Sequence, residues 1–187
     1  VVVGDGESET GAGVDNDGAI NTTEDGTTTI NGDSTSGTGV DNDGTIDTSD
    51  TGNTDINGNS ETGTGVGNGG AINTTDDGTT TINGATTSGT GINNDGTIHA
   101  ADDSQIDAKG TSTEGAGIVD TGSIVADANA KIVLDNNGTV KVLPDTSGNN
   151  GGNNGGGNNN GGDTPAPRTP PHGGGGAGGG IGGIGLG

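Results

Sequence analysis

The sequence predicts an all-β fold, a three-sided parallel β-helix of about five 26-residue coils, followed by a disordered C-terminal tail. Three observations support this expectation. Apolar residues recur every 26 positions, small residues stand two places from them, and Asn, Asp and Gly separate the apolar positions. A period of this length is typical of solenoids, in which each repeat is stabilised by stacking on its neighbours.

The first strand of each repeat is marked by an evenly spaced Val or Ile. These residues are Val14, Val40, Val66, Ile92 and Ile118. Two places before them stand Ala12, Thr38, Thr64, Thr90 and Ala116. Side chains two residues apart lie on the same face of a strand, so we expect both series to face a narrow interior.

The second strand follows the same pattern with an isoleucine in every repeat. Its anchors are Ile20, Ile46, Ile72, Ile98 and Ile124. Two places after them stand Thr22, Thr48, Thr74, Ala100 and Ala126. The residue between the two series changes freely among Asn, Asp, His and Val, as expected of a column that faces solvent.

A third series predicts the third side of the helix. Its members are Ile30, Ile56, Ile82, Ile106 and Ile132. The last two arrive two residues early, which we interpret as a loss of two residues before them. On this alignment the small residues that precede the anchors are Thr28, Thr54, Thr80, Ser104 and Ala130. Short segments rich in Thr, Val and Ile favour strands.

Turn-forming residues are expected at three corners. Asn16-Asp17-Gly18 and its equivalents follow the first strand, Asn31-Gly32 and its equivalents follow the third, and Asp25-Gly26 marks the remaining corner. Gly adopts positive φ without steric cost, and Asn or Asp can bond the backbone of a turn. Helices are excluded because Gly costs nearly 1 kcal/mol in a helix interior.

Two regions follow from this pattern. Residues 1–143 are expected to form the β-helix, with the denser apolar stretch 133–143 as a cap over its open end. Residues 144–187 contain Asn/Gly runs, a Pro-rich segment and a Gly tract, which predict a disordered linker or tail.

The composition excludes several classes of function. A net charge of −22 with only four Lys and Arg argues against nucleic-acid binding. No stretch approaches the ~20 apolar residues of a membrane-spanning helix. Val1–Val3 is too short for the core of a signal peptide, so we expect a mature fragment or an excised region. With no Cys and two isolated histidines, His99 and His172, we expect no enzyme, no catalytic residue and no cofactor.

The recurring phrase Val14-Asp15-Asn16-Asp17-Gly18-Ala19-Ile20 resembles the repetitive passenger domains of bacterial autotransporter adhesins. Related phrases occur in filamentous-haemagglutinin-like exoproteins, and the resemblance covers residues 5–143. It implies export across the outer membrane, a right-handed β-helix that is extracellular or at the bacterial cell surface, and a role in adhesion or self-association. The expected partners are cell surfaces, matrix or glycans, or copies of the chain itself.

A column of amides at the first corner predicts a structural ladder. Its members are Asn16, Asn42, Asn68, Asn94 and Asp120. They could act only as turn formers, or each side chain could bond the next along the stack. We favour the ladder, because an inward Asn two residues from a buried anchor needs a hydrogen-bond partner.

Four carboxylates beside this column are weak candidates for calcium: Asp15, Asp17, Asp41 and Asp43. On adjacent coils, unit charges repel by about 1 kcal/mol per pair even in water, and a bound Ca²⁺ would relieve that repulsion. Gly67 and Gly69 interrupt the cluster in the next repeat. We therefore favour solvated acids and no metal.

Two other functions compete with adhesion. An ice-binding face is suggested by the pairs Thr27/Thr29 and Thr79/Thr81, but Asn53/Asp55 and Asp103/Gln105 interrupt it in the alternate coils. A polysaccharide-acting β-helix enzyme would share the fold, but a fold alone does not carry chemistry.

Overall fold

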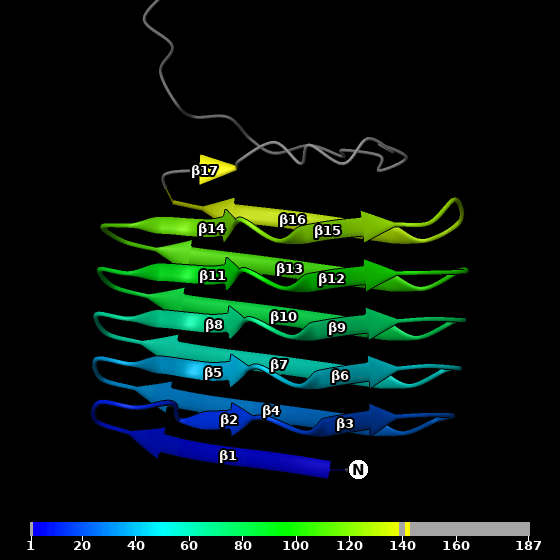
Figure 1. Cartoon of the computed structure of the whole chain (residues 1–187), viewed down its shortest axis with the longest axis horizontal. Coiled ribbons are helices and arrows are strands. Elements are labelled where there is room, and N and C mark those ends of the chain that lie inside the picture. Colours follow the sequence, from blue (N-terminus) through cyan, green and yellow to red (C-terminus); the bar gives the residue numbers. More distant parts are fainter. Residues whose placement is uncertain (1, 139–140, 143–187) are drawn as a thin grey trace, which may run out of the picture.

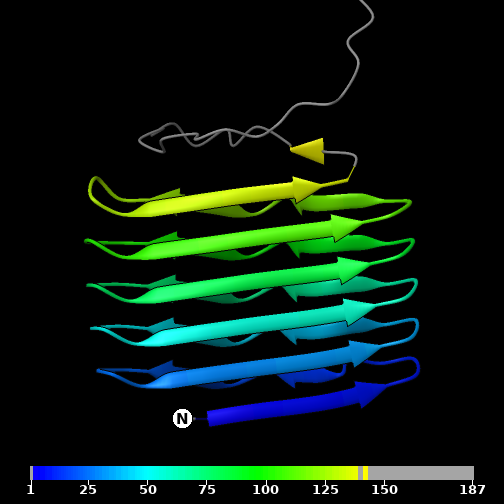
Figure 2. The same cartoon turned by 180° about the vertical axis from the view of Figure 1, so that it is seen from behind.

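The computed structural model describes residues 2–138 and 141–142. Within them the chain forms parallel strands and no helix, and winds upward as a right-handed solenoid (Figures 1 and 2). The all-β expectation and the three sheets of the β-helix are confirmed. The predicted tail, 144–187, lies outside the described residues, as does the end of the predicted cap at position 143.

Each coil contributes one strand to each of three sheets. Sheet A contains, in order, β1 (Val2–Ser8), β4 (Thr27–Ser34), β7 (Asn53–Ser60), β10 (Thr79–Thr86), β13 (Gln105–Ser112) and β16 (Lys131–Asn137). Sheet B contains β2 (Val14–Asn16), β5 (Thr38–Asn42), β8 (Thr64–Asn68), β11 (Thr90–Asn94), β14 (Ala116–Asp120) and β17 (Lys141–Val142). Sheet C contains β3 (Ala19–Thr22), β6 (Thr45–Thr48), β9 (Ala71–Thr74), β12 (Thr97–Ala100) and β15 (Ser123–Ala126).

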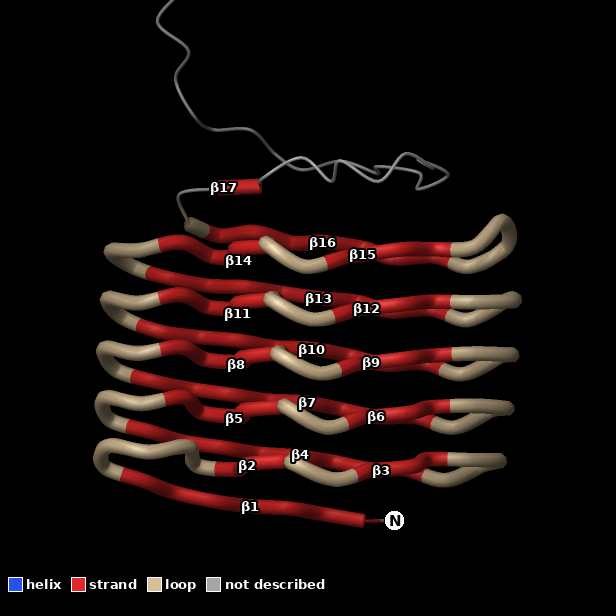
Figure 3. The backbone as a smooth tube through the Cα atoms, in the orientation of Figure 1, coloured by secondary structure: helices blue, strands red, loops and turns tan. Residues whose placement is uncertain are grey.

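The solenoid has a flattened outline. The short strands of sheets B and C follow one another along one face, and the long strands of sheet A form the opposite face (Figures 1 and 2). Loops stack on loops at both edges (Figure 3). Sheet A is therefore the broadest continuous surface of the rod.

The apolar anchors form three internal stacks, as the sequence predicts. Val40 and Val66 of sheet B are 1% exposed, and Ile46 and Ile72 of sheet C are fully buried. In sheet A, Ile56 is also fully buried. The anchors at the two ends of the stacks are only partly buried and pack against this core: Val14, Ile20, Ile124 and Ile132.

The third anchor series departs from the sequence alignment between β10 and β13. Ile106 lies beside Thr80, and Ala108 lies beside Ile82. The prediction that two residues are lost before Ile106 is therefore wrong, and the period of 26 continues through the ladder. Ser104 precedes β13 and is buried, at 1% exposure, with its Oγ donating to the carbonyl oxygen of Thr74 at 2.8 Å. It does not take the place of Thr80, which Ile106 holds. Aligning the repeats by their isoleucines failed because β13 has the large side chain first and the small one second, whereas β10 has the small one first.

The exchange of side chains in β13 is accompanied by a second exchange inside the rod. Thr74 and Thr80 are buried, and their hydroxyl oxygens lie 2.7 Å apart. At the equivalent positions of the next coil stand Ala100 and Ile106. Both hydroxyls are absent from this coil, so neither is left buried without a hydrogen-bond partner. An unpaired buried hydroxyl would cost about 1–3 kcal/mol.

Most of the described glycines are required by close packing and not by positive φ. Positive φ occurs at Glu24, Asp50, Asp76 and Asp102 among the described non-glycine residues, and no described glycine adopts it. A Cβ on Gly58 would overlap the carbonyl oxygen of Gly65 across the interior, between sheets A and B. The expected corner at Asn31-Gly32 is wrong, because this pair and its equivalents lie inside β4, β7 and β10. Glycine here lets two sheets approach backbone to backbone.

Candidate functional site

The amide column at the end of the sheet B strands is joined side chain to side chain. Asn42 donates from Nδ2 to Oδ1 of Asn68 at 2.7 Å, and Asn68 donates in the same way to Asn94 at 2.7 Å. Asn16 donates to Asn42 at 2.6 Å at the lower end. Asn42, Asn68 and Asn94 are at most 2% exposed. The column therefore lies within the rod and is not available to a ligand.

Each amide of this ladder also bonds the backbone of the following coil. Asn68 Nδ2 lies 3.1 Å from the carbonyl oxygen of Thr97. All the donors point toward the C-terminal end, where Asp120 accepts from Asn94 at 2.7 Å. The register places Val142 of β17 next to Asp120. A carboxylate only accepts hydrogen bonds, so it ends the ladder without leaving an N–H group unpaired.

The calcium candidates lie together on two adjacent coils. Asp15 pairs with Asp41 in the strand register. Burial raises the pKa of Asp41, and the nearby charges of Asp43, Asp15 and Asp17 raise it further. In the next coil, a Cβ on Gly67 would lie 2.9 Å from Oδ1 of Asp41. Over residues 2–138, no three His, Cys, Asp or Glu side chains are grouped to hold a metal ion.

The raised pKa predicts that Asp41 weakens the fold at neutral pH. Folding favours the protonated acid, so the stability that it contributes is present at low pH and is lost as pH rises through its pKa in the folded state. Asp41→Asn is therefore expected to raise the Tm at pH 7. At about pH 3, below the ordinary pKa of ~3.9, the variant and the wild type should melt together. Circular dichroism at both pH values measures the difference.

The same variants distinguish solvated acids from a calcium site. Asp103→Asn removes one charge from an exposed turn and is the matched control. With solvated acids, the Tm of the wild type should shift little between chelator and millimolar Ca²⁺. A rise of many degrees in the wild type that Asp41→Asn abolishes would contradict this expectation.

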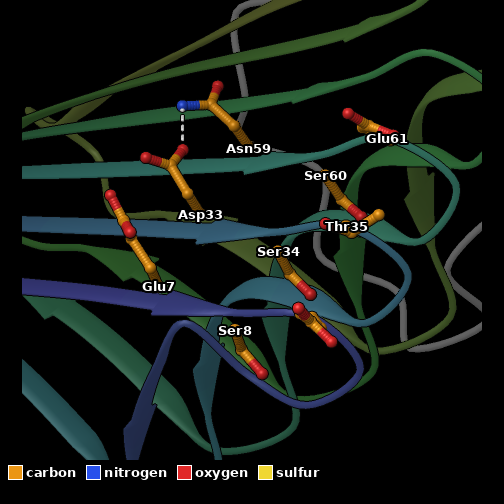
Figure 4. Close-up of a pocket in the computed structure, with 9 residues that line it drawn as sticks. Glu7, Ser8, Asp33, Ser34, Thr35, Asn59, Ser60 and Glu61 are labelled. Atoms are coloured by element: carbon orange, nitrogen blue, oxygen red, sulfur yellow. Dashed lines mark hydrogen bonds between the residues drawn. The ribbon is translucent and has the colours of Figure 1, made fainter.

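A shallow groove of about 560 Å³ lies where sheet A turns into sheet B (Figure 4). Asn59 and Asp33 form part of its wall, and Asn59 Nδ2 donates to Asp33 Oδ1 at 2.8 Å. The Oγ of Ser60 accepts from the N–H of Gly63 and donates to the carbonyl of Gly37, both at 2.9 Å. This hydroxyl therefore stabilises the turn between sheets A and B. His99 lies outside the groove, with its Nε2 3.4 Å from Oδ1 of Asp127.

A second amide ladder runs along the outer face of sheet A. Asn31 donates to Asp5 at 2.7 Å, Asn57 donates to Asn31 at 3.0 Å, and Asn83 donates to Asn57 at 2.9 Å. This ladder differs from the expectation that these asparagines form a corner. Their spacing of 26 was the available signal.

Beside this outer ladder, two columns of sheet A alternate in chemistry from strand to strand. β4 and β10 carry pairs of threonines, whereas β7 and β13 carry an amide and an aspartate. Asn53 Nδ2 donates to Asp55 Oδ2 at 3.1 Å, and Gln105 Nε2 donates to Asp107 Oδ2 at 2.6 Å. The alternating strip comprises Thr27, Thr29, Asn53, Asp55, Thr79, Thr81, Gln105 and Asp107.

The alternating strip corrects the residues expected on an ice-binding face. Gln105 lies beside Thr79, and Asp107 lies beside Thr81. The expected pair Asp103/Gln105 is therefore wrong, by the same two residues as the third anchor series. Regular threonine pairs are thus interrupted in every second coil by side chains that are hydrogen-bonded to each other.

No family model matches the chain, and no curated protein or solved structure matches it. In the part of the chain that the structure describes, no helix is long and apolar enough to cross a membrane.

Proposed function

We propose that this chain is an extracellular structural and adhesive repeat domain. Its place would be the bacterial cell surface, in a role similar to that of autotransporter passenger domains. The supporting observation is that the strand register presents the same outward positions in every coil, 26 residues apart. Weak contacts with another surface can then add along the rod, as in any multivalent array.

The exposed chemistry fits weak and repeated contacts. Within residues 3–138, the one large hydrophobic residue that is exposed is Val3, at 58%. The outer columns consist mainly of Asn, Asp, Thr and Gly, which offer hydrogen bonds rather than an apolar hot spot. The chain has no Cys, so repeated ladders stiffen the rod in place of disulfides.

The net charge predicts how association depends on salt. At −22, copies of the chain repel each other and other anionic surfaces at low ionic strength. The Debye length falls from about 30 Å at 0.01 M to about 8 Å at 0.15 M, so salt screens this repulsion. Attachment and clumping should therefore strengthen as salt is added.

Beads carrying the full chain test the proposal. We expect them to clump, or to attach to cells and matrix-coated surfaces, increasingly with ionic strength from about 0.01 to 0.15 M. Bare beads serve as the control. Indifference to salt without any attachment, together with measurable turnover of a polysaccharide, would contradict the adhesive function and favour an enzyme.

A further inference from the structure

The chemistry of the alternating strip repeats every two strands, and no other column of sheet A has this repeat among the described residues. Parallel strands lie about 4.8 Å apart, so its chemistry repeats about every 9.6 Å along the rod. Thr79 and Thr81 stand in the same register as Asn53 and Asp55 on one side and as Gln105 and Asp107 on the other. A partner that reads this strip must itself have a two-unit repeat along a straight axis.

An extended β-1,4-linked polysaccharide has such a repeat. Successive rings are turned by half a revolution, so that alternate rings present opposite edges, and each ring advances by nearly one strand spacing. Two residues along a strand span about 6.7 Å, which suits the width of one ring. A chain laid along the rod would place each ring over one strand, and its alternate edges would meet threonines and amide–aspartate pairs in turn.

The hydrogen-bonding groups of the strip suit sugar hydroxyls. A threonine hydroxyl both donates and accepts, and a carboxylate that receives one amide N–H keeps further acceptor sites. Asp55 and Asp107 are in this state, because Asn53 and Gln105 each donate to one of their oxygens. These bonds also restrict side-chain rotation before binding, which lowers the entropic cost of association.

The charge and the area of the strip restrict the class of ligand that it can bind. The eight residues of the strip include two carboxylates and no Lys or Arg, although Lys131 lies next to Gln105 in β16 and Lys109 lies in the neighbouring column. The net charge of −22 outweighs these two lysines, so polyanionic polysaccharides are repelled. Its area of roughly 130 Å² is far below the ~800 Å² that each partner buries in a stable protein–protein interface. A neutral, narrow and straight ligand fits both limits.

We propose that the alternating strip binds a neutral, extended β-1,4-linked polysaccharide lying parallel to the rod axis. This inference rests on the proposed adhesive function and names its ligand class. With no aromatic residue in the chain, rings cannot stack on side chains, and affinity comes from hydrogen bonds added over four strands.

Cosedimentation of the full-length protein with polysaccharide particles tests the proposal. Cellulose and chitin are the β-1,4-linked probes, starch is the α-linked comparator, and alginate is the anionic comparator. We expect binding to cellulose or chitin that changes little with salt, and none to starch or alginate. Titration with cellohexaose or chitohexaose should shift the NMR signals of Thr79, Thr81 and their strip neighbours.

Two double variants remove the alternation with residues that the fold already accepts there. Asn53→Thr with Asp55→Thr copies the neighbouring strands β4 and β10, and Thr79→Asn with Thr81→Asp copies β7. Each is expected to weaken binding about tenfold, the effect of losing one or two hydrogen bonds. Thr45→Ala on sheet C is the control, because Ala19 and Ala71 hold the equivalent positions, and its binding should be unchanged.

Binding of neither β-1,4 probe by the wild type, or wild-type binding by a folded double variant, would overturn the strip proposal. Equal binding to starch would do the same. If neither β-1,4 probe binds while beads carrying the wild-type chain still attach, adhesion uses another face and only the strip proposal fails.

Discussion

Gly70→Ala is expected to destabilise the fold by about 3 kcal/mol or more, a large share of the 5–15 kcal/mol typical of a domain. A Cβ at this position would overlap the carbonyl oxygen of Gly44 in the coil below. That same oxygen accepts a hydrogen bond from the N–H of Ala71 at 2.9 Å, and the N–H of Gly70 donates to the carbonyl oxygen of Asn42 at 2.9 Å. Relieving the overlap therefore breaks the inter-coil ladder. Urea unfolding followed by circular dichroism measures the loss.

Gly18→Ala is the matched control in the same column. Gly18 lies at the first coil, where a Cβ would meet only Oδ1 of Asn16 at 3.9 Å. Its stability should stay within about 0.5 kcal/mol of the wild type, as for most surface changes. Gly96→Ala should behave like Gly70→Ala, because its Cβ would overlap the carbonyl oxygen of Gly70. Equal stability of all three variants would show that the coils do not approach this closely.

The spacing of the anchors predicted the three sheets because a solenoid repeats its inward positions with its period. Ile46 and Ile72 could be placed in one stack by counting residues alone. The same reasoning failed at Ile106, where residue identity was given more weight than the count. Strand register is set by backbone hydrogen bonds, which are indifferent to whether Thr80 faces threonine or isoleucine above it.

The candidate sites also differ in how far the sequence predicts them. The inner amide column follows from period and inward position, so the placement of Asn42 and Asn68 could be expected. The outer ladder was missed because Asn57-Gly58 has the sequence of a turn, although the spacing of 26 was visible. The alternating strip was placed correctly except in β13, where its residues are Gln105 and Asp107. Only the structure shows that Gly58 is needed where sheet A touches sheet B, and that the strand continues through it.

Asn68→Asp is expected to cost about 3 kcal/mol or more at pH 7, because a buried charge would replace two hydrogen-bond donors. Asn68 donates to Oδ1 of Asn94 and to the carbonyl oxygen of Thr97. A carboxylate would face both of these acceptors without a proton, and only the bond from Asn42 would remain. Thermal and urea unfolding of the variant and the wild type measure the difference.

The pH dependence identifies the cause of this loss. Burial would raise the pKa of the new acid in the folded state above its unfolded value of ~3.9. Its penalty is thus largest above the raised pKa and shrinks as pH falls, when the protonated acid can donate to Asn94. Asp120→Asn is the control, since the amide still accepts from Asn94 at the end of the ladder, and about 1 kcal/mol or less should be lost. If the deficit of Asn68→Asp were the same at pH 7 and pH 3.5, it would arise from packing and not from the direction of the ladder.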